Sequence, residues 1–356
     1  GEFQKWYGNQ DYLVNWENDG EELMGYAAKL YGSPTRTIKN IAHYFKMGIT
    51  YSFVSSSNFG VRYTPKGFLF DVGGSTTFPK ENEIFYLTSF LTSCIASNML
   101  KIVAPTINFQ VGDLKALPII FPKQESTKQQ IDTLTQECID ISKEDWDSRE
   151  TSWDFTKNEL LKHLVPKGTL CEKSDSKIET AYNNYCSYWK EKFYQLHANE
   201  EELNRLFIDI YELGDELTPD VALKDITILK SESIINDRGE LEFKADEIMK
   251  QFISYAVGVM FGRYSLDSDG LVVANLNQDY PKDTTFEIDD DNVIPVLEDD
   301  YFSDDIASRI INFVKTTFGA ESLSENINFI EKCLGKTIRA YMVKDFYEDH
   351  IKRYKK

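Results

Sequence analysis

Side chains that could contact a polyanion gather in the first third of the sequence. Lys46, Arg62 and Lys66 supply cations. Hydroxyl and amide side chains lie between or after them: Ser55, Ser57, Asn58, Thr76, Asn108 and Gln110. Sequence-specific DNA readers place cations against phosphates, and amides or hydroxyls against base edges. We therefore predict that the three cations contact phosphates and that the six polar residues read bases.

An ordinary surface explanation competes with this prediction. Serine-rich turns and scattered cations also decorate soluble sheets that never meet nucleic acid, and composition alone favours that explanation. The net charge of −19 argues in the same direction, but residues 1–123 hold 11 basic and 10 acidic side chains, so the acidity belongs to residues 124–356. A near-neutral first part predicts weak and salt-sensitive binding of double-stranded DNA.

The residues that methyl-transfer or nucleotide chemistry would need do not occur in a usable pattern. An amino-directed DNA methyltransferase uses an (Asn/Asp/Ser)-Pro-Pro-(Tyr/Phe) loop, whereas all ten prolines here are isolated. No glycine-rich G-x-G-x-x-G or G-x-x-x-x-G-K-[ST] segment occurs either. The four histidines lack metal-ligand spacing, and Asp267 to Gly270 matches only half of a calcium-binding loop. We expect no catalytic residue, no cofactor site and no metal site in this chain.

Cysteine usage and hydropathy bear on the compartment. Five scattered cysteines form no C-x-x-C pair, and no secretory leader is visible, so we expect a reducing, cytoplasmic environment. The uncharged run from Ile84 to Leu100 is 17 residues long, at the lower edge of what spans a bilayer. Because it contains several Ser and Thr residues, we predict a buried packing helix and no membrane association.

Hydrophobic periodicity predicts a sheet with helices in residues 1–123. Short aromatic strands are expected around Trp6 and Trp16, with a polar turn at Asn18-Asp19-Gly20 and helical patterning after it. Alternation from Ile49 to Phe70 predicts two or three strands. We also expect a bend at residues 73–75, one helix over residues 84–102 and a strand over residues 107–111.

The pattern changes after Pro122. Apolar residues recur every three or four positions over residues 124–217, which predicts helices. A hairpin is expected over residues 226–243, then an amphipathic helix burying Phe252 and Tyr255, then an acidic loop and two helices with Ser303 and Ser324 as N-caps. The predicted fold is α+β. It comprises a mixed-sheet domain (1–123), a helical spacer or bundle (124–218) and a C-terminal α+β domain (219–356).

Several segments carry a family resemblance. Lys5 to Gly20 (KWYGNQDYLVNWENDG), Gly48 to Ser75 and Pro105 to Ile119 resemble the C-terminal half of PglX-type adenine DNA methyltransferases of the BREX phage-defence system. Those enzymes resemble type IIG restriction-modification enzymes. Leu203 to Val221 and Ile253 to Leu271 are similar to later segments of the same family, so the resemblance covers nearly the whole chain. None of these segments is catalytic.

The resemblance implies that DNA recognition and methyl transfer belong to different domains. Residues 1–123 would form a DNA target-recognition domain, and S-adenosylmethionine binding and methyl transfer to adenine N6 would belong to an N-terminal methyltransferase domain that this chain lacks. The first residue is Gly1 and not Met, which also leads us to expect a fragment. The alternative is an interaction module that docks other BREX proteins or a phage inhibitor without reading DNA. Mimicry of DNA charge is disfavoured, because the acidic residues cluster in loops and alternate with 28 cations.

Overall fold

A computed structural model describes residues 3–54, 59–104, 108–164, 177–273 and 284–354. The chain forms two compact units, one of residues 1–143 with 195–227 and the other of residues 144–194 with 228–356. Two long helices, α5 (Glu125–Asp147) and α7 (Ile178–Ile210), each contribute to both units and confirm the predicted helical region. Helices make up 52% of the structure and strands 7%, and the paired strands are antiparallel, which confirms the α+β class.

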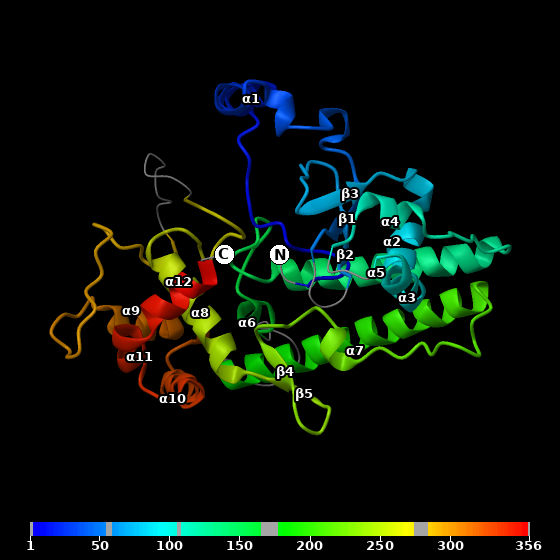
Figure 1. The fold of residues 1–356 in the computed structure, drawn as a ribbon. Coiled ribbons are helices and arrows are strands. Elements are labelled where there is room, and N and C mark those ends of the chain that lie inside the picture. Colours follow the sequence, from blue (N-terminus) through cyan, green and yellow to red (C-terminus); the bar gives the residue numbers. More distant parts are fainter. Residues whose placement is uncertain (1–2, 55–58, 105–107, 165–176, 274–283, 355–356) are drawn as a thin grey trace. The chain divides into compact units, whose positions relative to one another are not determined.

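The first unit contains a three-stranded sheet in the order β2-β1-β3 (Figure 1). The strands are β1 (Gly48–Ser52), β2 (Val61–Thr64) and β3 (Gly74–Thr77), all antiparallel. Ile49, Tyr51 and Val61 are buried on one face, as the alternation predicts. The predicted bend at residues 73–75 is wrong for its last two positions, because Gly74 and Ser75 pair with β1.

The predicted single helix over residues 84–102 is two helices, α2 (Ile84–Thr92) and α3 (Cys94–Val103). Ser93 separates them with an extended backbone, at ψ 159°. Its Oγ donates to the Phe90 carbonyl at 2.6 Å and accepts from the Ala96 N–H at 3.4 Å. One hydroxyl therefore satisfies the end of α2 and the start of α3, which apolar spacing alone does not reveal.

The first 47 residues are more helical than predicted. The strands expected around Trp6 and Trp16 are absent from the described residues apart from one parallel bridge between Trp6 and Arg62. Helix α1 (Glu17–Tyr31) contains the predicted polar turn, since Asn18, Asp19 and Gly20 all have positive φ. Two 3-10 turns follow, η1 (Pro34–Arg36) and η2 (Ile41–His43).

The strand predicted over residues 107–111 is wrong in its described part. Asn108 forms an isolated bridge to Val54 and belongs to no strand, and Val111 begins the short helix α4 (Val111–Lys115). The Asp113 carboxylate accepts the Gln110 backbone N–H at 2.8 Å, which caps this helix. The 3-10 turns η3 (Glu81–Glu83) and η4 (Leu223–Asp225) complete the described elements of this unit.

The second unit confirms the predicted hairpin and amphipathic helix. Strands β4 (Ser233–Ile235) and β5 (Leu241–Phe243) pair antiparallel, and α8 (Ala245–Met260) buries Phe252 and Tyr255. The remaining helices are α6 (Glu159–Lys162), α9 (Ile306–Phe318), α10 (Leu323–Leu334), α11 (Ile338–Lys344) and α12 (Phe346–Tyr354).

The N-cap predictions for this unit are wrong. Asp305, and not Ser303, caps α9, with its Oδ1 accepting the Ser308 N–H at 2.8 Å. Ser322 precedes α10 and Ser324 lies inside it. Asp305 is the residue directly before Ile306, the first residue of α9, whereas Ser303 lies two positions too early to reach the free N–H groups. Asp305 also receives a hydrogen bond from Arg339, 34 residues later, which holds the carboxylate in place.

Two general properties concern the described part of the chain only. No helix in it combines the length and the apolar character needed to cross a membrane. No group of three or more His, Cys, Asp or Glu side chains in it is placed to hold a metal ion.

Candidate DNA interface

Two of the predicted phosphate contacts lie at the same end of the three-stranded sheet. Gly48 pairs with Thr64, and Lys46 and Lys66 stand two positions beyond that pair on the adjoining chain segments. The pairing continues past the strands, because the Phe45 N–H donates to the Phe68 carbonyl at 2.9 Å and the Gly67 N–H donates to the Phe45 carbonyl at 3.0 Å. Sheet register therefore brings two exposed lysines together from positions 20 residues apart.

The environment of Lys66 leaves it accessible. Its side chain is 68% exposed, and its Nζ lies 3.5 Å from a carboxylate oxygen of Glu81, which is 75% exposed. An exposed ion pair of this length contributes a free energy of only about 0–1 kcal/mol. A phosphate can therefore compete with Glu81 for this ammonium group.

Three threonine hydroxyls form a row across the sheet next to these lysines. The Thr50 Oγ1 lies 2.7 Å from the Thr64 Oγ1 and 3.0 Å from the Thr76 Oγ1. We call Thr50, Thr64 and Thr76 the hydroxyl row. Thr76 is among the predicted base-reading residues. Thr50 and Thr64 are not, because their alignment with Thr76 depends on strand register, which the sequence pattern does not reveal. All three are half-buried, so their outer edges remain accessible.

Gly48 lies at a tightly packed position on this face of the sheet. A Cβ atom at Gly48 would lie 2.6 Å from the Thr76 Cγ2 and 2.9 Å from the Thr77 carbonyl oxygen. No side chain fits there without moving the backbone of β3. Gly48 is itself buried, so the hydroxyl row is flanked on this side by a packed position that only glycine can occupy.

Arg62 does not occupy the accessible position that a phosphate contact requires. It is 5% exposed, and its Nη1 donates to the Gln4 carbonyl at 3.3 Å and to the Ser52 Oγ at 3.2 Å. Burial lowers the pKa of the Arg62 guanidinium to about 10, so the group stays charged at neutral pH. Its register partner is Thr50, so its side chain lies on the same face of the sheet as the hydroxyl row, where the Gln4 carbonyl and the Ser52 hydroxyl hold it.

The two amides that are predicted to read bases and lie in the described residues are near the other end of β1. The Phe109 N–H donates to the Phe53 carbonyl at 2.8 Å, and Asn108 bridges Val54. Asn108 and Gln110 are both exposed. The chain from Gly48 to Val54 covers about 20 Å at the usual rise of a strand, enough to cross a major groove about 12 Å wide. Ser55, Ser57 and Asn58 lie outside the described residues.

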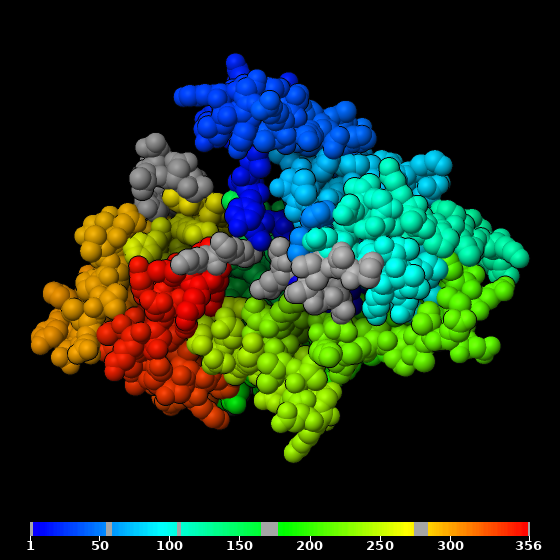
Figure 2. All heavy atoms as spheres, viewed as in Figure 1, coloured from blue at the N-terminus to red at the C-terminus, as the bar shows by residue number. Residues whose placement is uncertain are grey.

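A second exposed surface belongs to α1 and the segment before it. Its apolar side chains are mostly uncovered: Tyr12, Leu13, Val14, Tyr26, Leu30 and Tyr31 are 47–77% exposed. We call these six residues the α1 surface. Residues 11–31 carry five acidic side chains and one basic side chain, so this surface repels DNA. Figure 2 shows the segment in dark blue at the surface of the molecule.

In comparisons with known proteins, the whole chain aligns with part of each of two longer proteins. No family model matches it. It is 38% identical over 367 residues to the adenine-specific methyltransferase PglX of Lacticaseibacillus casei (strain Zhang), of which it spans 29%. It is 34% identical over 383 residues to the adenine-specific methyltransferase BrxX of Escherichia coli O9:H4 (strain HS), of which it spans 30%. The chain is therefore homologous, over its full length, to a region that makes up about three-tenths of PglX-type adenine-specific methyltransferases.

Proposed function

We propose that the chain is the DNA-recognition part of a BREX-type, site-specific N6-adenine DNA methyltransferase that acts in the cytoplasm in defence against phage. Residues 1–123 read the DNA target, residues 124–218 form a spacer and residues 219–356 a C-terminal domain. S-adenosylmethionine binding and methyl transfer lie in an N-terminal methyltransferase domain outside these residues. The observation that carries this proposal is the similarity of the whole chain to about three-tenths of two proteins named adenine-specific methyltransferases.

The geometry of the sheet supports a division between phosphate and base contacts. Lys46 and Lys66 neutralise phosphates. The one hydroxyl proton that the two bonds within the hydroxyl row leave over donates to a phosphate oxygen beside them, so Thr76 is reassigned from base reading to the phosphate-contacting row. Asn108 and Gln110, about 20 Å away along β1, reach base edges together with the predicted residues Ser55, Ser57 and Asn58. Arg62, buried on the same face of the sheet as the hydroxyl row, strengthens the positive potential there and does not touch the DNA.

Removing both lysines is expected to weaken DNA binding without altering the fold. The Lys46→Ala/Lys66→Ala variant of the chain loses two phosphate contacts, so the slope of log K against log salt falls by about 2, and affinity at low salt falls roughly tenfold. Fluorescence anisotropy with a labelled duplex at several salt concentrations measures both. The matched control is Lys29→Ala/Lys39→Ala, which removes two exposed lysines away from the sheet. Equal losses in the two variants would reject the assigned phosphate contacts.

The α1 surface favours a second role in docking. We propose that its partner is the region of the full-length methyltransferase that this chain does not cover. A 15-residue helix is marginal in water by itself, and α1 buries only Gly20 and Ala27. Because residues 11–31 are acidic and the α1 surface is apolar, the complementary partner surface is apolar with basic residues around it. About seven-tenths of each relative lies outside the matched region and is available to supply one.

Hydrogen exchange is expected to reveal this docking. Amides of α1 should exchange at least tenfold more slowly in the full-length methyltransferase than in the chain alone, while the exposed turn at residues 236–239 exchanges alike in both. Serine at Tyr26 and Leu30 should remove the difference. Equal exchange of α1 in the two proteins would overturn the assignment, and protection only after addition of another defence protein or a phage inhibitor would reassign the surface to that partner.

A further inference from the structure

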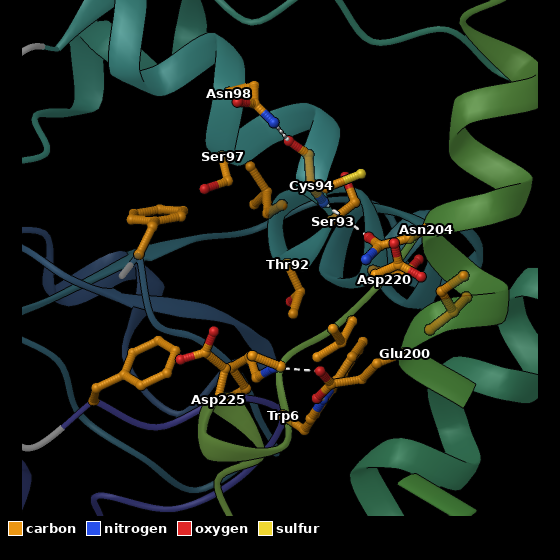
Figure 3. Close-up of a pocket in the computed structure, with 18 of the residues that line it drawn as sticks. Trp6, Thr92, Ser93, Cys94, Ser97, Asn98, Glu200, Asn204, Asp220 and Asp225 are labelled. Atoms are coloured by element: carbon orange, nitrogen blue, oxygen red, sulfur yellow. Dashed lines mark hydrogen bonds and ion pairs between the residues drawn. The ribbon is translucent and has the colours of Figure 1, made fainter. Parts of the chain in front are cut away.

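The first unit contains a cavity of about 270 Å³ that the DNA-recognition proposal does not use (Figure 3). Five segments line it: residues near Trp6, Phe59 before β2, α2 and α3 around their junction, one face of α7 around Asn204, and the chain from Asp220 to Asp225. Its volume is near the lower end for small-molecule sites, so it suits a ligand of about ten non-hydrogen atoms.

Several hydrogen-bond donors of the wall are already used within the chain. The Asn204 Nδ2 donates to the Pro219 carbonyl at 3.1 Å, and the Asn98 Nδ2 donates to the Cys94 carbonyl at 2.8 Å. The hydroxyls of Thr92 and Ser93 donate to the Thr88 and Phe90 carbonyls, at 2.8 Å and 2.6 Å. The Thr92 Oγ1 and the Asn98 Oδ1 keep accepting capacity.

The buried charges at the cavity floor also satisfy each other. Lys5 and Glu200 form an ion pair with side chains 9% and 5% exposed. The Trp6 Nε1 donates to the second Glu200 oxygen at 2.7 Å. Because the charges of Glu200 and Lys5 are paired with each other, neither determines the charge of the ligand that the cavity attracts.

Two carboxylates at the cavity wall keep their charge available. Within the described residues, the side chains of Asp220 and Asp225 have no hydrogen-bond or ion-pair partner. One further cation, Lys101, lines the cavity and is exposed. The remaining charge in and around the cavity is therefore negative, and its free hydrogen-bonding groups are mainly acceptors.

We propose that this cavity binds an organic cation, an ammonium or guanidinium group on a short alkyl chain. The carboxylates of Asp220 and Asp225, which lie at different sides of the cavity in Figure 3, attract and pair with the cationic groups of the ligand. The alkyl part lies against the apolar side chains of the lining, which include Leu91 and Leu203. The same chemistry occurs in a free diamine and in an arginine side chain of a protein partner.

The thiol in the wall fits binding better than catalysis. Burial raises the pKa of the Cys94 thiol, so it remains protonated at neutral pH and is a poor nucleophile. Its backbone N–H donates to the Asn204 Oδ1 at 2.9 Å, which fixes the start of α3 beside the cavity.

Calorimetric titration of the chain tests this proposal. Putrescine and agmatine are expected to bind one saturable site at physiological salt, whereas 1,4-butanediol, similar in size to putrescine and uncharged, is not. The Asp220→Asn/Asp225→Asn variant should bind at least tenfold more weakly with an unchanged unfolding temperature. The control Asp215→Asn/Glu216→Gln removes two exposed acidic charges close in sequence but outside the cavity lining, and should bind as the parent does.

The outcomes separate the proposal from general attraction of cations to an acidic chain. Absence of saturable binding, equal binding of 1,4-butanediol, or an equal loss in the control variant would overturn it. A Gly-Arg-Gly peptide distinguishes the two sources: binding tenfold tighter than that of agmatine assigns the cavity to a partner's arginine, and the reverse order assigns it to a free amine. DNA binding by the Lys46→Ala/Lys66→Ala variant is independent of each result.

Discussion

Replacing Arg149 by Met is expected to lower the free energy of unfolding by about 3–5 kcal/mol, because it leaves two buried carboxylates without a cation. The Arg149 Nη2 lies 2.9 Å and 3.1 Å from the two Asp145 oxygens and 3.7 Å from a Glu232 oxygen. Asp145 is 1% exposed and Glu232 3%. These contacts join the end of α5 to the start of the β4–β5 hairpin, and the Asp145 carboxylate also accepts the Leu229 N–H at 2.8 Å.

The pH dependence of this variant distinguishes lost charge from lost packing. Burial already raises the pKa of Asp145 to about 6 with the guanidinium present. Without Arg149 the folded-state pKa of Asp145 rises further above its unfolded value, so the folded protein binds more protons and regains stability as pH falls. The destabilisation should therefore shrink between pH 7 and pH 5 in urea-unfolding experiments.

A matched arginine provides the control for Arg149. Arg205 on α7 is 48% exposed and pairs with Glu202 and Asp209. Because exposed pairs contribute about 0–1 kcal/mol, Arg205→Met should shift the urea midpoint little. Equal shifts in the two variants, or a shift in Arg149→Met that does not change with pH, would contradict the buried-network explanation.

The second large effect is expected at Glu200. Glu200→Gln should cost about 3–5 kcal/mol of unfolding free energy, because it leaves the buried Lys5 ammonium without its counter-charge. The amide oxygen of glutamine can still accept from the Trp6 Nε1, so the change isolates the charge. This pair fixes the N-terminal segment, which bridges Arg62 through Trp6, so its loss should also loosen the sheet edge.

A double variant tests whether charge imbalance causes that loss. Adding Lys5→Met to Glu200→Gln removes the stranded ammonium and should recover at least half of the lost unfolding free energy. Urea-unfolding midpoints of the two single variants and the double variant measure the coupling. Additive losses would mean that the two side chains act separately and that their ion pair is unimportant.

The elements that could be predicted are those whose signal is local. The alternation of Ile49, Tyr51, Val61 and Tyr63 indicated β1 and β2 because one face of each strand is buried. The spacing of Phe252 and Tyr255 indicated α8 for the same reason. The break between α2 and α3 was missed because the apolar stripe continues through Ser93, and only the hydrogen bonds of its hydroxyl show where one helix ends.

The candidate site was less predictable because its chemistry depends on distant partners. Arg62 looks like a surface cation in the sequence, but it is buried against the Gln4 carbonyl, 58 positions away. The hydroxyl row requires the register that aligns Thr50 with Thr76 and brings Thr64 beside it, and no local pattern contains that information. Lys46 and Lys66 were identified by type, while their proximity at one sheet end follows only from strand pairing.

The central claim, that residues 1–123 choose the DNA sequence that is methylated, is tested most directly by long-read detection of modified adenines. Cells carrying the full-length methyltransferase are compared with cells in which residues 1–123 are exchanged for those of a relative with another target. The account predicts that the methylated motif changes to the relative's motif while adenine N6 remains the modified atom. An unchanged motif at undiminished methylation would contradict it.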